Sequence, residues 1–358
     1  MRVTGRVMGV VALICALIAI LAAPMGAAYA QPTERYKRAV DVVASQRLIV
    51  KTLQGEGRIA LNLSRDWTKP DPGITRALLV FHGQLRNVDV YTRGGEETLK
   101  AAGNDAAGTL LIVPQFLAVP DIAAHGLDAT MLRWDAERWL AGEPAVGPAP
   151  LSAFDAIDAI LARLADRALF PNLKRVVVAG HSAGGQLVQR YAIAGRGDVA
   201  LDAAGIGVRY IVSNPSSYLY FSDERPAVES VAGEARADPA TCAGYNIWKY
   251  GPSGAPPYIG GNAAALEARY ARRDVVYLLG TADIDPFMGS LDKTCAGRLQ
   301  GPFRYARGKA YFAHIKARNP TSPHKRLDVV GVGHDGGAMF ASPCGRHAIF
   351  DTGGCVLP

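Results

Sequence analysis

The chain has 358 residues, of which 49% are hydrophobic and 20% charged, and its formal net charge is +7. This length suits a single domain decorated with insertions. The charges are scattered without blocks of one sign, and no stripe of Lys and Arg alternates with aromatic residues. The composition therefore argues against a nucleic-acid partner, and no repeat of solenoid or propeller period occurs.

The first thirty residues have the pattern of a secretory signal peptide. Two arginines precede the apolar run 7–23, and the small-residue sequence Ala-Tyr-Ala follows at 28–30. This order predicts cleavage before Gln31, and the alternative of an uncleaved membrane anchor is disfavoured because the run is short for a spanning helix. We expect residues 31–358 to form a secreted or periplasmic protein without stable membrane insertion. Loss of two arginines and no acidic residue lowers its formal charge from +7 to +5.

Four cysteines remain after this cleavage: Cys242, Cys295, Cys344 and Cys355. An even number in an exported chain predicts two disulfides, for which three pairings are possible. A Cys344–Cys355 bond would close a short C-terminal loop, and a Cys242–Cys295 bond would tie an insertion to the body. Neither C-x-x-C nor H-x-x-x-H spacing occurs, so a zinc site is not expected.

Six short apolar runs alternate with longer helical stretches, a pattern typical of a parallel sheet covered on both faces. The runs span residues 77–81, 109–113, 175–179, 208–212, 274–279 and 327–330. An antiparallel hairpin is predicted before them, over residues 48–63. A helix is predicted from Ser152, because Asp155 follows at capping-box spacing and an amphipathic run comes next.

Two connections, residues 117–150 and 214–270, are too long for simple loops. Both are rich in aromatic residues, and long loops in compact domains are often functional. Trp134, Tyr218 and Trp248 are therefore candidates for the walls of a substrate cleft. The other interpretation is that these side chains pack the insertions onto the core.

The most specific motif is Gly-His-Ser-Ala-Gly at residues 180–184, which matches G-x-S-x-G. It lies between a predicted strand and a predicted helix, which is the context of a nucleophile elbow. Glycines are needed at 180 and 184 because a side chain there would collide with neighbouring backbone. The motif predicts Ser182 as a nucleophile at the carboxyl edge of the sheet.

A serine hydroxyl needs a base, and the base needs an orienting acid. His334 follows the last predicted strand on a glycine-rich loop, so we expect it to be the base. Asp283 follows the 274–279 strand and is the expected acid, with Asp285 as the alternative. A calcium loop at these aspartates is disfavoured because further ligands are absent.

An acyl-transfer site also needs two N–H donors for the oxyanion. We expect them from Ala183, directly after the nucleophile, and from Gln84 in the loop after the first parallel strand. His82 would shape that loop. The sequence at 331–336 fits G-x-G-x-x-G, but too little chain follows for a dinucleotide-binding unit, so no cofactor is expected.

These motifs together resemble the α/β-hydrolase superfamily, from Arg76 to Phe340. The resemblance implies a mostly parallel, about eight-stranded sheet with helices on both faces, and a cap after the sixth strand, where residues 214–270 lie. Gln84 differs from the H-G-G-G loop of one lipase and esterase branch, so the substrate preferences of that branch are not carried over. Segments 214–218 and 245–251 resemble a group of secreted serine hydrolases, which implies no particular substrate.

The function expected from these residues is hydrolysis of a small-molecule or polymeric carboxylic ester through an acyl-enzyme on Ser182. Acyl transfer, or amide and peptide cleavage, by the same three residues is the alternative, because fold and triad alone do not separate these reactions. An exported binding protein on a non-catalytic hydrolase scaffold is the alternative from another class.

Overall fold

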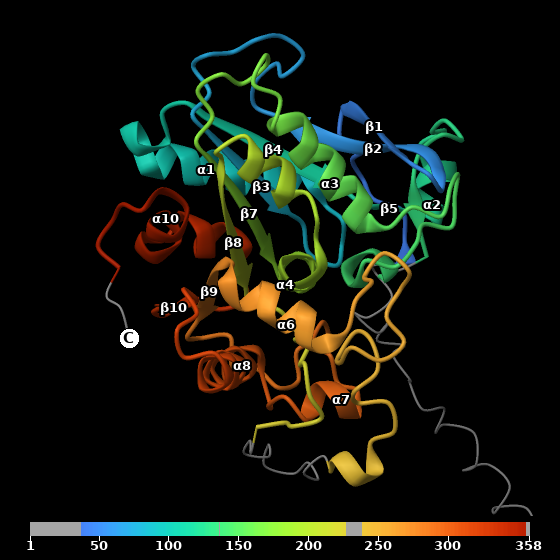
Figure 1. Cartoon of the computed structure of the whole chain (residues 1–358), viewed down its shortest axis with the longest axis vertical. Helices are drawn as coiled ribbons and strands as arrows, with labels where there is room; N and C mark the ends of the chain where they lie inside the picture. Colours follow the sequence, from blue (N-terminus) through green and yellow to red (C-terminus); the bar gives the residue numbers. More distant parts are fainter. Residues whose placement is uncertain (1–36, 136, 227–237, 356–358) are drawn as a thin grey trace, which may run out of the picture.

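The computed structural model describes residues 37–135, 137–226 and 238–355 (Figure 1). The predicted signal peptide lies outside these residues. Among the described residues, no helix has both the length and the apolar character needed to cross a membrane.

An eight-stranded sheet forms the centre of the molecule, with the strand order β1-β2-β4-β3-β7-β8-β9-β10. Its strands are β1 (Gln46–Thr52), β2 (Gly55–Leu63), β3 (Arg76–Phe81), β4 (Thr109–Gln115), β7 (Arg175–His181), β8 (Gly207–Ser213), β9 (Asp274–Gly280) and β10 (Lys325–Val329). The hairpin β1–β2 joins the sheet antiparallel to β4, and all other neighbours pair in parallel. The predicted hairpin and parallel sheet are both confirmed. Two short strands, β5 (Leu117–Ala118) and β6 (Arg133–Trp134), pair separately.

Helices cover both faces of the sheet (Figure 1). They are α1 (Val88–Ala102), α2 (Val119–Ala124), α3 (Ala153–Leu164), α4 (Ala183–Ala194), α5 (Asp198–Ala203), α6 (Ala263–Arg272), α7 (Cys295–Arg298), α8 (Arg304–Arg318), α9 (Gly336–Ala341) and α10 (Pro343–Phe350). Short 3₁₀ turns occur at Gly103–Ala106, Arg138–Ala141 and Pro239–Thr241.

Successive residues of the central strands belong to two different hydrophobic cores. Leu79 of β3 packs in the core that contains Leu187 of α4, together with residues of α3, α6 and α8. Leu78, its neighbour in the strand, packs in the core that contains Met339 of α9, together with residues of α1 and α10. Because side chains alternate between the faces of a strand, a parallel strand buried on both faces must be apolar throughout. This explains the continuous apolar runs in the sequence.

The predicted N-cap of α3 is present. Ser152 Oγ accepts a hydrogen bond from Phe154 N at 3.0 Å, and Ser152 N donates to Asp155 Oδ2 at 2.8 Å. The reciprocal bonds satisfy backbone donors that the first helical turn leaves unpaired.

Two disulfides are present, Cys242–Cys295 and Cys344–Cys355, which is one of the three pairings allowed by the sequence. The first ties the segment that follows β8, the sixth strand of the main sheet, to α7. The second closes the C-terminal loop after α10.

Candidate active site

Ser182 lies at a sharp turn between β7 and α4. Its backbone has φ 59° and ψ −117°, a region that side-chain-bearing residues rarely adopt. The turn is so tight that a Cβ on Gly180 would lie 2.1 Å from Gly184 O, and a Cβ on Gly184 would lie 2.3 Å from Phe81 O. The predicted elbow geometry is therefore present, and both glycines are required by close backbone contact.

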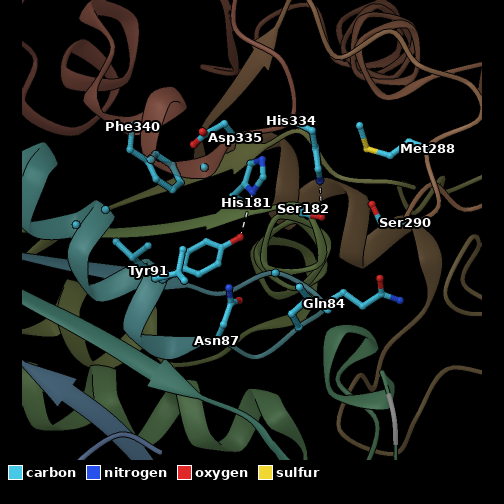
Figure 2. Close-up of a pocket in the computed structure, with 18 of the residues that line it drawn as sticks. Gln84, Asn87, Tyr91, His181, Ser182, Met288, Ser290, His334, Asp335 and Phe340 are labelled. Atoms are coloured by element: carbon cyan, nitrogen blue, oxygen red, sulfur yellow. Dashed lines mark hydrogen bonds between the residues drawn. The ribbon is translucent and has the colours of Figure 1, made fainter. Parts of the chain in front are cut away.

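Three predicted site residues come together at this turn, at the carboxyl edge of the sheet, and Figure 2 shows two of them, Ser182 and His334. Ser182 Oγ lies 2.9 Å from His334 Nε2, and His334 Nδ1 lies 2.7 Å from Asp283 Oδ2. A carboxylate can only accept, so Nδ1–H donates to Asp283 and Nε2 is free to accept the serine proton. Asp285 is exposed and instead accepts a hydrogen bond from Phe287 N at 2.8 Å. The geometry assigns the position of the acid to Asp283.

The environment keeps His334 neutral. Burial lowers the pKa of His334 below the ordinary histidine value, and the hydrogen bond to Asp283 opposes this shift. A neutral imidazole beside a hydroxyl can act as a base at neutral pH.

Arg304 lies behind the acid and was not anticipated from the sequence. Its side chain is buried, and Nη1 lies 3.7 Å from Asp283 Oδ1. Nη2 donates to Ser290 O at 2.7 Å and to Ser290 Oγ at 3.0 Å. The guanidinium thus compensates a carboxylate that is itself almost fully buried, and it connects that carboxylate to the loop around Ser290. An arginine at the start of an amphipathic helix carries no sequence signal for this role.

The two predicted oxyanion donors lie next to Ser182. Ala183 is the first residue of α4, so its N–H has no acceptor within the helix. Gln84 lines the pocket that contains Ser182, and a Cβ on the preceding Gly83 would lie 3.7 Å from Ser182 Cβ. The loop after β3 therefore approaches the serine closely, as the predicted oxyanion role requires.

His82 shapes this loop, as predicted. It is fully buried; its Nδ1 lies 2.9 Å from Gly83 O, and its Nε2 accepts from Phe116 N at 3.0 Å. Burial lowers the pKa of His82 to about 4, so the ring is a neutral structural bridge.

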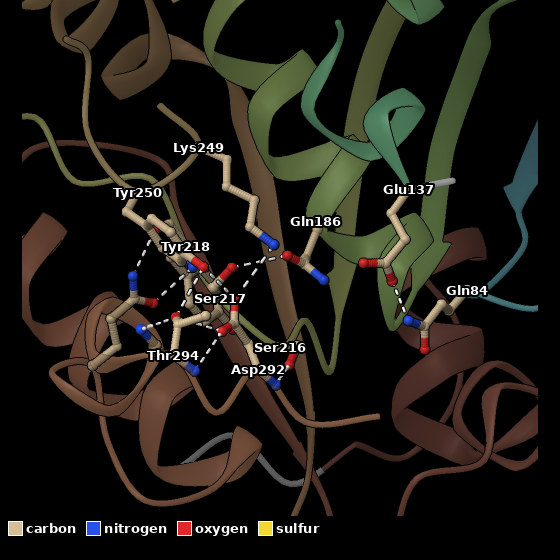
Figure 3. Close-up of polar contacts among 12 residues, drawn as sticks. Gln84, Glu137, Gln186, Ser216, Ser217, Tyr218, Lys249, Tyr250, Asp292 and Thr294 are labelled. Atoms are coloured by element: carbon tan, nitrogen blue, oxygen red, sulfur yellow. Dashed lines mark hydrogen bonds and ion pairs between the residues drawn. The ribbon is translucent and has the colours of Figure 1, made fainter. Parts of the chain in front are cut away.

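The side chain of Gln84 donates a hydrogen bond to Glu137, which lies in the 117–150 connection (Figure 3). Burial raises the pKa of Glu137, while nearby Lys249 opposes the shift. The predicted oxyanion loop is thus tied to one of the two long connections.

A second polar cluster holds the other connection against the body (Figure 3). Lys249 Nζ lies 3.3 Å from Asp292 Oδ2, which also accepts from Tyr250 Oη at 2.7 Å. Burial raises the pKa of Asp292, but Lys249 and hydrogen bonds from Thr294 and Tyr250 outweigh it and lower the pKa to about 2. Asp292 is therefore an ionised anchor.

The three aromatic residues predicted to wall the cleft do not line the pocket around Ser182. Trp134 and Tyr218 are fully buried, the first with Nε1 donating to Glu143 O at 3.0 Å and the second stacked on Tyr311. Trp248 is half-buried, and its Nε1 donates to Ala141 O at 2.8 Å. This prediction is corrected: the large aromatic rings pack the long connections onto the core, and the N–H groups of the two tryptophans find backbone acceptors there.

The pocket that reaches Ser182 has a volume of about 510 Å³. Residues missed by the sequence prediction form much of its lining, namely Tyr91, His181, Met288, Ser290 and Phe340 (Figure 2). His181 packs against His334 with ring centroids 4.5 Å apart, and its Nδ1 lies 3.1 Å from Tyr91 Oη. Tyr91 follows the predicted oxyanion loop by a few residues, so its position near the site could have been predicted from chain order. The approach of Met288 and Phe340 depends on loop paths that no motif encodes.

The sheet topology, the elbow and the Ser–His–Asp geometry define the α/β-hydrolase fold. Among solved structures, this chain is similar to LpqC, a poly(3-hydroxybutyrate) depolymerase from Bordetella parapertussis, with a TM-score of 0.57, 21% identity, and coverage of 87% of this chain and 92% of that one. It is also similar to poly(aspartic acid) hydrolase-1 from Sphingomonas sp. KT-1, with a TM-score of 0.53, 18% identity, and coverage of 83% and 95%. No family model matches the sequence, and no curated protein matches it. At these identities the likeness establishes the shared fold.

The choice between the two aspartates is testable by substitution. Asp283→Asn is expected to lower kcat/KM for an activated ester by about 10³-fold or more, because an amide at this position favours the wrong imidazole tautomer. Asp285→Asn, the matched control, is expected to stay within about twofold of wild type, because Asp285 only caps a surface turn. Steady-state kinetics on both purified variants measure this. Equal losses, or a larger loss at Asp285, would contradict the assignment.

The position of Arg304 predicts a change in pH dependence. A nearby cation disfavours protonation of His334, so Arg304→Gln is expected to raise the pKa of His334. Because the neutral imidazole is the active form, the acid limb of the kcat/KM profile should move to higher pH. Arg304→Lys, which keeps the charge, should largely restore the wild-type limb.

Arg307→Gln is the control for Arg304→Gln, since Arg307 lies in the same helix and is equally buried but donates to Gly301 O and Ser216 O. The acid limb of the kcat/KM profile of Arg307→Gln should coincide with that of wild type. An unmoved limb in Arg304→Gln would show that the cation does not act on the base.

Proposed function

We propose that this protein is a serine hydrolase that cleaves carboxylic esters through an acyl-enzyme on Ser182. The observation that carries the proposal is the continuous hydrogen-bonded chain from Ser182 Oγ through the His334 ring to Asp283. The strained backbone at Ser182 adds support, because such strain is typical of functional sites and has no evident packing benefit here. A non-catalytic binding protein would need neither feature.

The proposed reaction has two steps. Ser182 Oγ attacks the ester carbonyl while His334 Nε2 accepts its proton, so a C–O bond forms and the carbonyl oxygen becomes an oxyanion. The N–H groups of Ala183 and Gln84 stabilise that charge. Collapse of the intermediate breaks the ester bond, and His334 returns the proton to the departing alcohol.

Hydrolysis of the acyl-enzyme repeats these steps with water. His334 takes a proton from the water that attacks the acyl carbon, and then gives it to Ser182 as the free acid departs. Asp283 stabilises the imidazolium in both half-reactions. Throughout the cycle, the guanidinium of Arg304 compensates the negative charge of the buried Asp283 carboxylate.

The two similar structures support the hydrolase class, since one is described as a depolymerase and the other as a hydrolase of a polymer. Small-molecule and polymeric esters are both included in the proposed substrate class. The two disulfides support a location in an oxidising compartment, either secreted or periplasmic.

The proposal predicts that Ser182→Ala lowers kcat for p-nitrophenyl acetate by about 10³-fold or more, because the nucleophilic oxygen is removed. The matched control is Ser290→Ala, which removes a hydroxyl from the lining of the same pocket that is hydrogen-bonded to Arg304 and not to an imidazole. That variant should retain activity within about fivefold. Release of p-nitrophenolate by freshly purified proteins measures both. Turnover by Ser182→Ala at the wild-type rate would disprove the mechanism.

A further inference from the structure

The pocket extends beyond Ser182 into the space between α1 and α9. Figure 2 shows Met288 and Ser290 on one side of Ser182, and Tyr91 and Phe340 on the other side, past His181. Val80 and Phe340 line the pocket although their exposed fractions are only 2% and 3%. The pocket therefore reaches below the surface to the side chains of the core. We refer to the part lined by Val80, Tyr91, Gly94, Gly337 and Phe340 as the inner chamber.

The inner chamber is mostly apolar: of the five residues that define it, Tyr91 alone has a polar side chain, and its hydroxyl is hydrogen-bonded. The hydroxyl of Tyr91 lies 3.1 Å from His181 Nδ1, and Asp335, at the start of α9, accepts from Ala338 N at 3.0 Å. The rim also carries apolar side chains, since Leu85 and Val90 are among the exposed large hydrophobic residues and both line the pocket. Asp335 is the only Asp, Glu, Lys or Arg among the residues that line the pocket, and it is exposed. An anionic group would therefore lose its hydration here without gaining a counter-charge, whereas an apolar group would be stabilised.

Two glycines leave the chamber open. A Cβ on Gly94 would have Gly337 Cα at 3.4 Å as its nearest neighbour, and a Cβ on Gly337 would have Asp335 Oδ1 at 3.5 Å. Both are ordinary contacts. The adjacent glycines differ, because a Cβ on Gly95 would lie 2.8 Å from Leu111 Cδ2 and one on Gly336 would lie 3.0 Å from His181 Cγ. Gly94 and Gly337, which both line the pocket, therefore leave room for a small side chain without a clash.

We propose that the inner chamber binds an uncharged, apolar segment of the ester, attached either to the acyl carbon or to the alcohol oxygen. This inference rests on the proposed function and specifies its substrate class. It makes Gly94 and Gly337 specificity-determining residues: the missing side chains provide the volume that the substrate occupies. The aliphatic or aryl segment would displace water from an apolar cavity that opens beside the reacting serine.

Gly337→Ala and Gly337→Val test the proposal by filling the chamber. Wild type and variants are compared on two series: p-nitrophenyl acetate, butyrate and octanoate, and the methyl, butyl and octyl esters of acetic acid. The ratio of kcat/KM for the longest to the shortest member should fall by about tenfold or more in one series, since a few displaced methylenes have this effect in a fitted pocket. The series that responds identifies the side of the ester bound there.

Two further variants separate this effect from damage to the fold. Gly94→Ala narrows the chamber from the opposite helix while improving helix propensity, so it should shift the same ratio without lowering Tm. Ala338→Val changes an exposed residue of α9 and should leave the ratio at the wild-type value. If both Gly337 variants retain acetate turnover and the long-to-short kcat/KM ratios are unchanged in both series, the inner-chamber proposal is overturned. The proposed function is unaffected by that result.

A binding measurement keeps the inference separate from the catalytic proposal. Saturation-transfer NMR with 1-hexanol should detect binding to wild type and to Ser182→Ala, and a clearly weaker signal with Gly337→Val. If wild type hydrolyses no ester, the proposed function fails, while this NMR comparison still decides whether the chamber binds an apolar chain. Equal saturation-transfer signals from wild type and Gly337→Val would overturn the inner-chamber proposal.

Discussion

The site depends on the backbone conformation at Ser182. A positive φ at this residue points its side chain out of the sheet edge, and the turn that imposes it requires backbone contact across Gly180 and Gly184. Such strain persists only where the surroundings over-determine it. Here β7 is hydrogen-bonded between β3 and β8, and α4 is buried along its whole length, so the turn cannot relax independently.

Parallel strands then bring the partners of Ser182 to the same place. The loops after β3, β7, β9 and β10 all emerge at the carboxyl edge of the sheet, and they carry Gln84, Ser182, Asp283 and His334 respectively. The resulting charge arrangement is compact, with one carboxylate, one neutral imidazole and the guanidinium of Arg304. A buried carboxylate paired only with a neutral ring would be costly, and the nearby cation offsets much of that cost.

The fold and the reacting groups were predictable because strong local constraints encode them. Continuous apolar runs require a sheet covered on both faces, and the spacing of glycines around Ser182 requires the turn. The ambiguity between Asp283 and Asp285 could not be resolved from sequence, because which carboxylate reaches His334 depends on the path of a single loop. In the structure, Asp283 is buried, whereas Asp285 is exposed and caps a surface turn.

The lining of the pocket was not predictable for a different reason. Large aromatic residues such as Trp134 and Tyr218 gain more from core packing than from a position in an open cleft, and sequence shows only that they are aromatic. The inner chamber instead arises where glycines of two helices distant in sequence lie against each other. Arg304 likewise acquires its role only through the tertiary contact with Asp283.

The activation of Ser182 by His334 underlies every step of the proposed reaction. Peptide mass spectrometry after treatment with a fluorophosphonate tests it directly, since this reagent phosphonylates an activated serine. We expect one equivalent of adduct on the peptide that contains Ser182, with loss of ester turnover in proportion, and almost no adduct in His334→Ala. An adduct on a different residue, or an unmodified protein that still hydrolyses esters, would contradict it.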